Sequence, residues 1–137
     1  SDKWVLSELA RTAAEVTANL DKYELGLAAE KVENFIWDIY CDWYIEICKT
    51  RLNGEDAQQA DTARKVLVWV LDKALKLLHP FMPFITEEIY QALPGSAETI
   101  MTQEWPDAGK MTAWPQECAD FEVLMDYIKQ CAPSAMI

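Results

Sequence analysis

Apolar residues recur at steps of three and four along the first half of the chain, which is the period of an amphipathic α-helix. One such stripe predicts a helix over residues 3–21, followed by a short connection at residues 23–26. A second helix is predicted over residues 27–51, about 37 Å long at 1.5 Å per residue. The short connection favours an antiparallel pair. Because apolar positions cover more than half of the second helix, we expect its neighbours to enclose it most completely.

A third helix follows a turn signal at Asn53-Gly54. Asp56 and Gln59 have the spacing of a capping box, which marks the start of this helix. Its apolar face continues to Leu78, where the pattern is interrupted.

Pro80 and Pro83 form a corner between the third helix and a fourth. Each lacks an amide N–H and has a fixed φ, so neither can lie deep inside a helix. Thr86 is placed to cap the fourth helix, predicted over residues 86–93, before Pro94-Gly95 ends it. Four large apolar side chains flank the corner: Phe81, Met82, Phe84 and Ile85. Because a free loop rarely exposes so many apolar groups, we expect them to pack on the core.

Beyond Gly95 the pattern weakens, and residues 99–102 are predicted to form a short extended segment. Four apolar residues mark a short last helix: Phe121, Leu124, Met125 and Ile128. A chain of 137 residues with only four glycines is expected to form one helical domain over residues 1–137. The predicted fold class is all-α: an up-down antiparallel helical bundle of four main helices plus a short C-terminal helix.

The formal net charge of −11 argues against a non-specific nucleic-acid binder, whose affinity depends on neutralising phosphates. No apolar run in the sequence is long enough to span a membrane. The cysteines at positions 41, 48, 118 and 131 form no CxxC pair, and the one histidine is His79. These features predict no zinc site and reduced thiols in a cytoplasmic protein.

Motifs of the common enzyme classes are missing from the sequence. It contains no P-loop, GxGxxG, GxSxG or HExxH, and no Cys/His pair arranged for nucleophilic catalysis. We therefore expect no catalytic residue and no metal site in this chain. His79 lies beside Pro80 at the end of the third helix, where a corner residue is expected rather than a general base.

In an up-down bundle, one pole gathers the start of the first helix, the connection between the second and third helices, and the end of the fourth. We call the residues gathered there the basic tip: Lys3, Trp4, Lys49, Arg51, Arg64 and Lys65. Basic side chains can hold phosphates, and an aromatic ring can stack on an unpaired base. The alternative is that these are ordinary helix-end charges that complement the helix dipoles. Acidic residues at positions 55, 56 and 61 dilute the patch.

Two strings and a dipeptide resemble a known family. Residues 77–93 read LLHPFMPFITEEIYQAL, residues 35–52 read FIWDIYCDWYIEICKTRL, and Trp105-Pro106 follows a short apolar run. These segments resemble the class I aminoacyl-tRNA synthetases for branched aliphatic amino acids, among which the valyl-tRNA synthetases match best. The resemblance spans most of the chain, from Trp4 to Trp105.

The resemblance implies an anticodon-binding helical bundle, which would be a fragment of a larger synthetase. Its implied partners are the tRNA anticodon stem-loop and the remainder of the synthetase chain, with no membrane and no DNA. The tRNA-contacting residues would be those of the basic tip. HIGH-like and KMSKS-like motifs are absent here. The resemblance therefore assigns ATP and Mg to the catalytic domain of the full protein and no cofactor to this chain.

Two alternatives stay open. The chain could be the same bundle of an isoleucyl- or leucyl-tRNA synthetase, whose bundles share the resemblance. It could also be a free helical protein-interaction module that exposes Trp37, Trp69 or Trp114 as an anchor.

Overall fold

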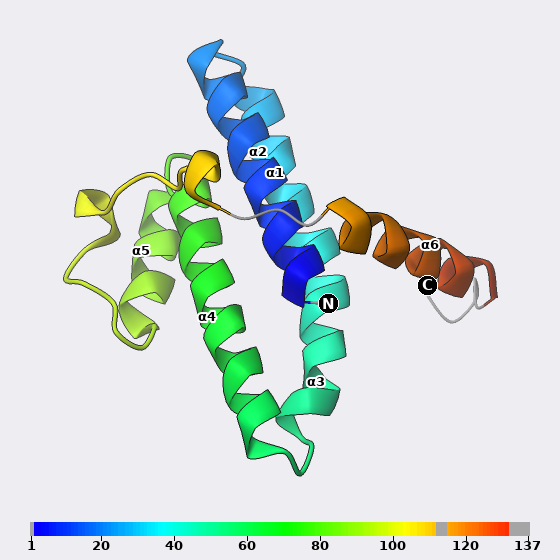
Figure 1. Cartoon of the computed structure of the whole chain (residues 1–137). Coiled ribbons are helices and arrows are strands. Elements are labelled where there is room, and N and C mark those ends of the chain that lie inside the picture. The colour runs from blue at the N-terminus through cyan, green and yellow to red at the C-terminus, as the bar shows by residue number, and fades with distance from the viewer. Residues whose placement is uncertain (1, 112–114, 132–137) are drawn as a thin grey trace.

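The computed structural model describes residues 2–111 and 115–131, and within these ranges every regular element is helical (Figure 1). In chain order the elements are α1 (Asp2–Asp21), α2 (Leu25–Asn34), the π-helix η1 (Phe35–Ile45), α3 (Glu46–Leu52), α4 (Ala57–Leu78), α5 (Pro83–Ala92), the 3₁₀ turns η2 (Ile100–Thr102) and η3 (Ala108–Lys110), and α6 (Pro115–Cys131). The all-α prediction is confirmed. No helix in the described ranges is long and apolar enough to cross a bilayer.

The predicted second helix is one continuous rod made of α2, η1 and α3. Its buried side chains Phe35, Tyr40, Tyr44 and Cys48 follow each other at steps of five, four and four. These steps are wider than the 3.6 residues of an α-helical turn and match the wider turn of a π-helix. The wide turn keeps both tyrosines on the enclosed side, where the Tyr40 hydroxyl donates to the Leu67 carbonyl of α4 at 3.1 Å.

Helices α1, α2–η1–α3 and α4 surround the main core, with α1 and α2 side by side (Figure 1). The predicted cap of α4 is confirmed, because the Asp56 carboxylate accepts hydrogen bonds from the amides of Gln58 and Gln59 at 2.9 and 3.3 Å. Helix α1 contributes Trp4, Val5, Leu9, Ala13 and Val16 to this core.

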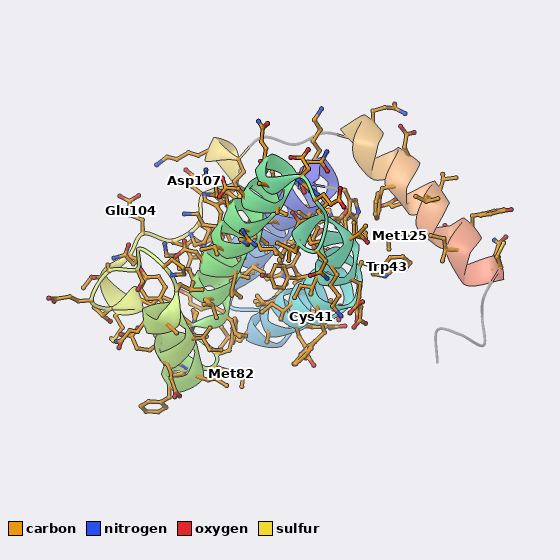
Figure 2. All side chains as sticks on the ribbon, turned by 90° about the horizontal axis from the view of Figure 1, so that it is seen from below. Cys41, Trp43, Met82, Glu104, Asp107 and Met125 are labelled. Carbon is orange, nitrogen blue, oxygen red and sulfur yellow. The ribbon has the colours of Figure 1, made fainter. Side chains whose placement is uncertain are left out.

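The fourth helix does not join this core in the way expected of a four-helix bundle. Helix α5 lies on the side of α4 away from α1 (Figure 1), and a small separate cluster forms there from Leu75, Tyr90 and Ile100. Helix α6 projects to the opposite side, with Met125 directed toward Trp43 of η1 (Figure 2). The last helix, at Pro115–Cys131, is longer than predicted.

The proline corner starts its helix earlier than predicted. Helix α5 begins at Pro83, because a proline without an N–H fits the first helical position. Thr86 therefore lies inside the first turn and is fully buried rather than capping the helix. Its hydroxyl donates to the Met82 carbonyl at 2.8 Å and lies 2.8 Å from Nδ1 of His79. His79 is thus a corner residue, as expected.

The expectation that all four apolar side chains of the corner pack on the core is wrong. Phe81 is half-buried against the core, but Phe84 is 91% exposed. We call the exposed apolar group the α5 outer face: Met82, Phe84, Ile85 and Ile89. The buried positions of α5 are Thr86 and Tyr90, and the apolar residues on its other sides are left exposed.

The segment predicted as extended at residues 99–102 is instead the 3₁₀ turn η2. The Glu87 carboxylate of α5 accepts hydrogen bonds from the amide of Ile100 at 2.8 Å and from the side-chain amide of Gln91 at 2.9 Å. This side chain therefore fixes the turn on α5, a contact between distant residues that local sequence does not indicate.

Candidate functional site

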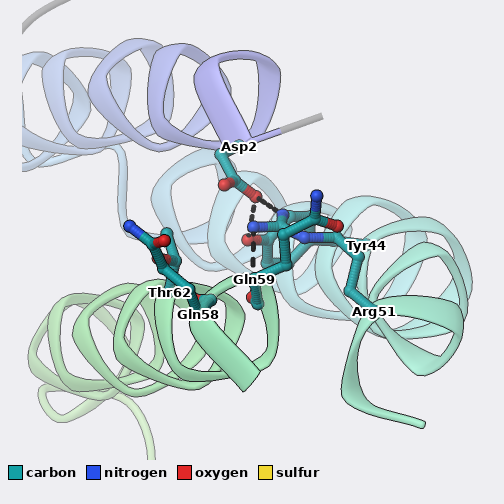
Figure 3. Close-up of polar contacts among 6 residues, drawn as sticks. All are labelled: Asp2, Tyr44, Arg51, Gln58, Gln59 and Thr62. Atoms are coloured by element: carbon teal, nitrogen blue, oxygen red, sulfur yellow. Dashed lines mark hydrogen bonds and ion pairs between the residues drawn. The ribbon is translucent and has the colours of Figure 1, made fainter. Parts of the chain in front are cut away.

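Arg51, one member of the basic tip, lies where α1, α3 and α4 meet (Figure 3). Nη1 of Arg51 lies 2.6 Å from the Asp2 carboxylate of α1, and Nη2 donates to the Gln59 carbonyl of α4 at 3.5 Å. The Tyr44 hydroxyl donates to the same Asp2 oxygen at 2.7 Å. These contacts tie the first turn of α1 to η1, α3 and α4.

The electrostatics of this junction follow from its hydrogen bonds. The bond to Asp2 raises the pKa of the Arg51 guanidinium, and burial together with the same carboxylate raises the pKa of the Tyr44 hydroxyl. The Arg51 side chain is only 23% exposed. Arg51 thus stays charged, and two of its five N–H donors are engaged within the protein.

Two lysines of the basic tip are paired with acids on the surface. Lys49 lies 2.6 Å from Glu46 within α3, and Lys65 lies 2.8 Å from Asp61 within α4. The Asp61 carboxylate raises the pKa of Lys65. Both pairs are exposed, so solvent screening leaves them with little effect on stability. A phosphate group could therefore replace the acid at little cost.

The remaining members of the basic tip differ in accessibility. Lys3 and Arg64 are exposed, and within the described residues Arg64 has neither an ion pair nor a hydrogen bond. Trp4 is only 2% exposed and stacks on Phe121 of α6, with 4.4 Å between the ring centres. The expectation that Trp4 is offered to a base is therefore corrected: α6 covers its ring, and Trp4 belongs to the core.

The structure extends this set of residues along α4. Arg64 and Lys65 do not face only the pole, because they also line a cavity of about 610 Å³ between α4 and the end of α5. Trp69 and Lys76 of α4 line the same cavity. A usable signal was present in the sequence, since Lys65, Trp69 and Lys73 follow each other at steps of four and so share one side of a helix.

The residues that the structure describes contain no group of side chains arranged to bind a metal ion. Among residues 2–111 and 115–131, no three His, Cys, Asp or Glu side chains lie close enough together to hold an ion. Cys48 is buried, and burial is the main cause that raises the pKa of its thiol. The site presents exposed cationic side chains on a rigid helical frame, an arrangement that suits ligand recognition.

A comparison with known families agrees with this helical fold. Residues 2–132 match the sequence model of the family described as the anticodon-binding domain of tRNA ligase, and the chain belongs to that family. The similar relatives indicate which tRNA ligase the domain resembles. The valine–tRNA ligase of Staphylococcus epidermidis is 46% identical over 134 residues, which is 98% of this chain and 15% of the relative.

Further relatives carry the same name. The valine–tRNA ligase of Bacillus cereus is 46% identical over 129 residues, covering 94% of this chain and 15% of the relative. That of Staphylococcus saprophyticus is 43% identical over 136 residues, covering 99% of this chain and 16% of the relative. The chain thus spans about 15% of the length of the curated relatives it matches.

Proposed function

We propose that this chain is the domain of a valine–tRNA ligase that binds the tRNA anticodon stem-loop and so supports ATP-dependent aminoacylation. The observation that carries the proposal is the family match over residues 2–132, together with 43–46% identity to valine–tRNA ligases over nearly the whole chain. ATP and Mg would be bound by a catalytic domain elsewhere in the full protein. This domain would contribute no catalytic residue, and it would act in the cytoplasm, where tRNA is charged.

The geometry of the basic tip supports an RNA-binding role. An anticodon loop presents phosphates and unpaired bases at the end of a stem, and such loops are the usual targets of sequence-specific RNA recognition. Lys3, Lys49, Arg64 and Lys65 are exposed at the tip and can contact phosphates. Arg51 would act mainly as a positioning residue, because its contacts with Asp2 and Gln59 hold the frame that carries the others.

The proposal predicts that Lys49→Ala in the full-length ligase weakens tRNA binding without disturbing amino-acid activation. We expect the KM for tRNA to rise roughly 3- to 10-fold and the salt slope of binding to fall by about 1, as for one lost phosphate contact. Aminoacylation kinetics measure the first effect, and valine-dependent ATP–pyrophosphate exchange should stay unchanged. Lys31→Ala is the matched control, because Lys31 is an exposed lysine of α2 paired with Glu15, away from the tip.

An equal loss in aminoacylation and in pyrophosphate exchange would contradict the anticodon role of Lys49, because a remote binding residue should not affect activation. The choice of amino acid is tested separately. Purified tRNAs for valine, isoleucine and leucine are offered to the full protein, and preferential charging of an isoleucine or leucine tRNA would reject the valine assignment.

A further inference from the structure

A groove formed by two adjoining cavities lies along the side of α4 that faces α5 and the segment after it. It consists of two cavities of about 610 and 490 Å³, and both are lined by Trp69, Lys76 and Gln103. We call this the α4 groove. From Arg64 to Lys76 it follows α4 for about 18 Å, at 1.5 Å per residue. It therefore extends well beyond the basic tip.

The charge of the groove is opposite to that of the chain. Its lining holds five of the twelve Lys and Arg residues but three of the 23 Asp and Glu residues, although the chain as a whole carries −11. The basic members are Arg64, Lys65, Lys73, Lys76 and Lys110. The acidic members are Asp72, Glu104 and Asp107.

The acidic residues of the groove do not form one-to-one ion pairs with its basic residues. Asp72 serves two lysines, with Nζ of Lys73 at 3.7 Å and Nζ of Lys76 at 2.9 Å from the same carboxylate oxygen. Arg64 and Lys110 have no ion pair within the ranges that the structure describes. The groove therefore keeps a surplus of positive charge that an anionic ligand could neutralise.

The indole ring of Trp69 lies among these cations. Trp69 is 42% exposed and lines both cavities, and Nζ of Lys73 lies 5.4 Å from the centre of its ring. Deeper in the groove, Nζ of Lys76 lies 5.8 Å from the ring centre of buried Tyr90. Cations beside an accessible aromatic face are the combination with which proteins bind single-stranded nucleic acid, where the cations hold the backbone and the ring stacks on a base.

The opposite wall of the groove is built from segments that are fixed in place. The Trp105 indole N–H donates to the Thr17 hydroxyl of α1 at 2.9 Å, which holds the far rim beside α4. Near the end of α5, the Ala97 amide donates to the Tyr90 hydroxyl at 3.2 Å. Figure 2 shows Glu104 and Asp107 on this side of the molecule, away from α6. The groove is thus largely preformed, which lowers the cost of ordering it around a ligand.

We propose that the α4 groove binds a single-stranded polynucleotide segment, with one unpaired base stacked on Trp69 and its neighbouring phosphates held by Lys73, Lys76 and Arg64. In the full protein this segment would be an unpaired stretch of tRNA, and to that extent the inference rests on the proposed function. It goes further by placing an RNA contact along α4, away from Lys3 and Lys49. A duplex cannot offer an unstacked base to Trp69, and an acidic peptide has no base to stack.

The test compares variants of the full-length ligase in their binding of a labelled single-stranded uridine 12-mer. We expect Trp69→Ala to weaken binding roughly 5- to 150-fold, the range for one lost base stack, and Trp69→Phe to retain most of the affinity. Lys73→Ala combined with Lys76→Ala should weaken binding and lower its salt slope by about 1.4, at about 0.7 per lost contact with a single strand. Trp37→Ala is the matched control, because Trp37 is 60% exposed on η1 and does not line the groove.

Two results would overturn the proposal. One is binding of the 12-mer by Trp69→Ala within twofold of the unsubstituted ligase. The other is equal competition by a poly-glutamate peptide of the same charge, which would make the groove a site for acidic peptides rather than for RNA. A loss of affinity for the 12-mer that leaves a hairpin duplex unaffected would support it.

Failure of this inference can be told apart from failure of the proposed function. If Lys49→Ala raises the KM for tRNA while Trp69→Ala changes neither tRNA nor 12-mer binding, the anticodon role stands and the groove is rejected. If Trp69→Ala weakens both and Lys49→Ala weakens neither, the groove stands and the basic tip is rejected as the binding surface.

Discussion

A single carboxylate, Asp2, accepts hydrogen bonds from two side chains that lie more than forty positions away in sequence. It fixes Tyr44 and Arg51 against the first turn of α1, where Trp4 is also buried. At the residue scale, part of the predicted basic tip is therefore structural. The sequence shows the charge of Arg51, but the partner of that charge depends on which helices meet.

The Tyr44 hydroxyl provides a test of this junction. Replacing Tyr44 by Phe removes one hydrogen bond to a charged group and keeps the ring in the core, so we expect the free energy of unfolding to fall by about 1–2 kcal/mol. Urea denaturation followed by tryptophan fluorescence measures the change. Tyr127→Phe is the control, because Tyr127 is 65% exposed on α6 and should have no measurable effect. A similar loss in both variants would argue against the Asp2 contact.

At the scale of elements, the helices were predictable because their apolar residues recur regularly, while their irregular features were not. The Asp56 cap and the end of α4 at Leu78 follow from local residue types and agree with the structure. The π-helical middle of the second helix does not follow, because its hydrogen-bond pattern depends on how Tyr40 and Tyr44 pack against neighbours. The start of α5 at Pro83 follows from the preference of proline for the first position of a helix. Thr86 is a competing signal, because threonine is also a common N-cap residue and would place the start three residues later.

The contact between α5 and η2 should depend on pH. Hydrogen bonds from the Thr99 hydroxyl and the Ile100 amide lower the pKa of Glu87 from its ordinary value of 4.5. Because folding lowers this pKa, the stabilisation is complete above pH 4.5 and is lost as pH falls through the lower pKa of the folded state. We expect the protection of the Ile100 amide against hydrogen exchange to fall in that acidic range, after correction for the intrinsic rate.

Glu87→Gln should remove this pH dependence, because it has no carboxylate to protonate. The Leu93 amide serves as the internal control, since its acceptor is the Tyr90 carbonyl, which does not titrate. Equal changes at Ile100 and Leu93 would show that α5 opens as a whole and would reject a specific role for Glu87.

At the scale of the molecule, the sequence predicts the class and the helices better than the binding surface. The proline corner at residues 77–93 and the aromatic string at residues 35–52 are local in sequence, so both can be recognised from the sequence alone. The α4 groove could not, because its wall comes from residues 93–111, whose course over α4 is set by contacts such as Trp105 with Thr17. An ideal bundle predicts the basic tip, whereas α5 lies on the outside of α4 and Arg64 and Lys65 line the groove between these helices.

The α5 outer face has a consequence for the colloidal behaviour of this chain. At low ionic strength its net charge of −11 keeps copies apart, and salt screens that repulsion. Exposed Phe84, Ile85 and Met82 can then meet, so light scattering should report stronger attraction between copies as salt rises.

Phe84→Ser should reduce that attraction at a stability change within about 0.5 kcal/mol, since the ring is almost fully exposed. Exposed Tyr127→Ser is the comparison, and equal effects of both variants would reject a special role for α5. The salt that weakens an RNA complex would thus be the salt that makes the unbound chain associate.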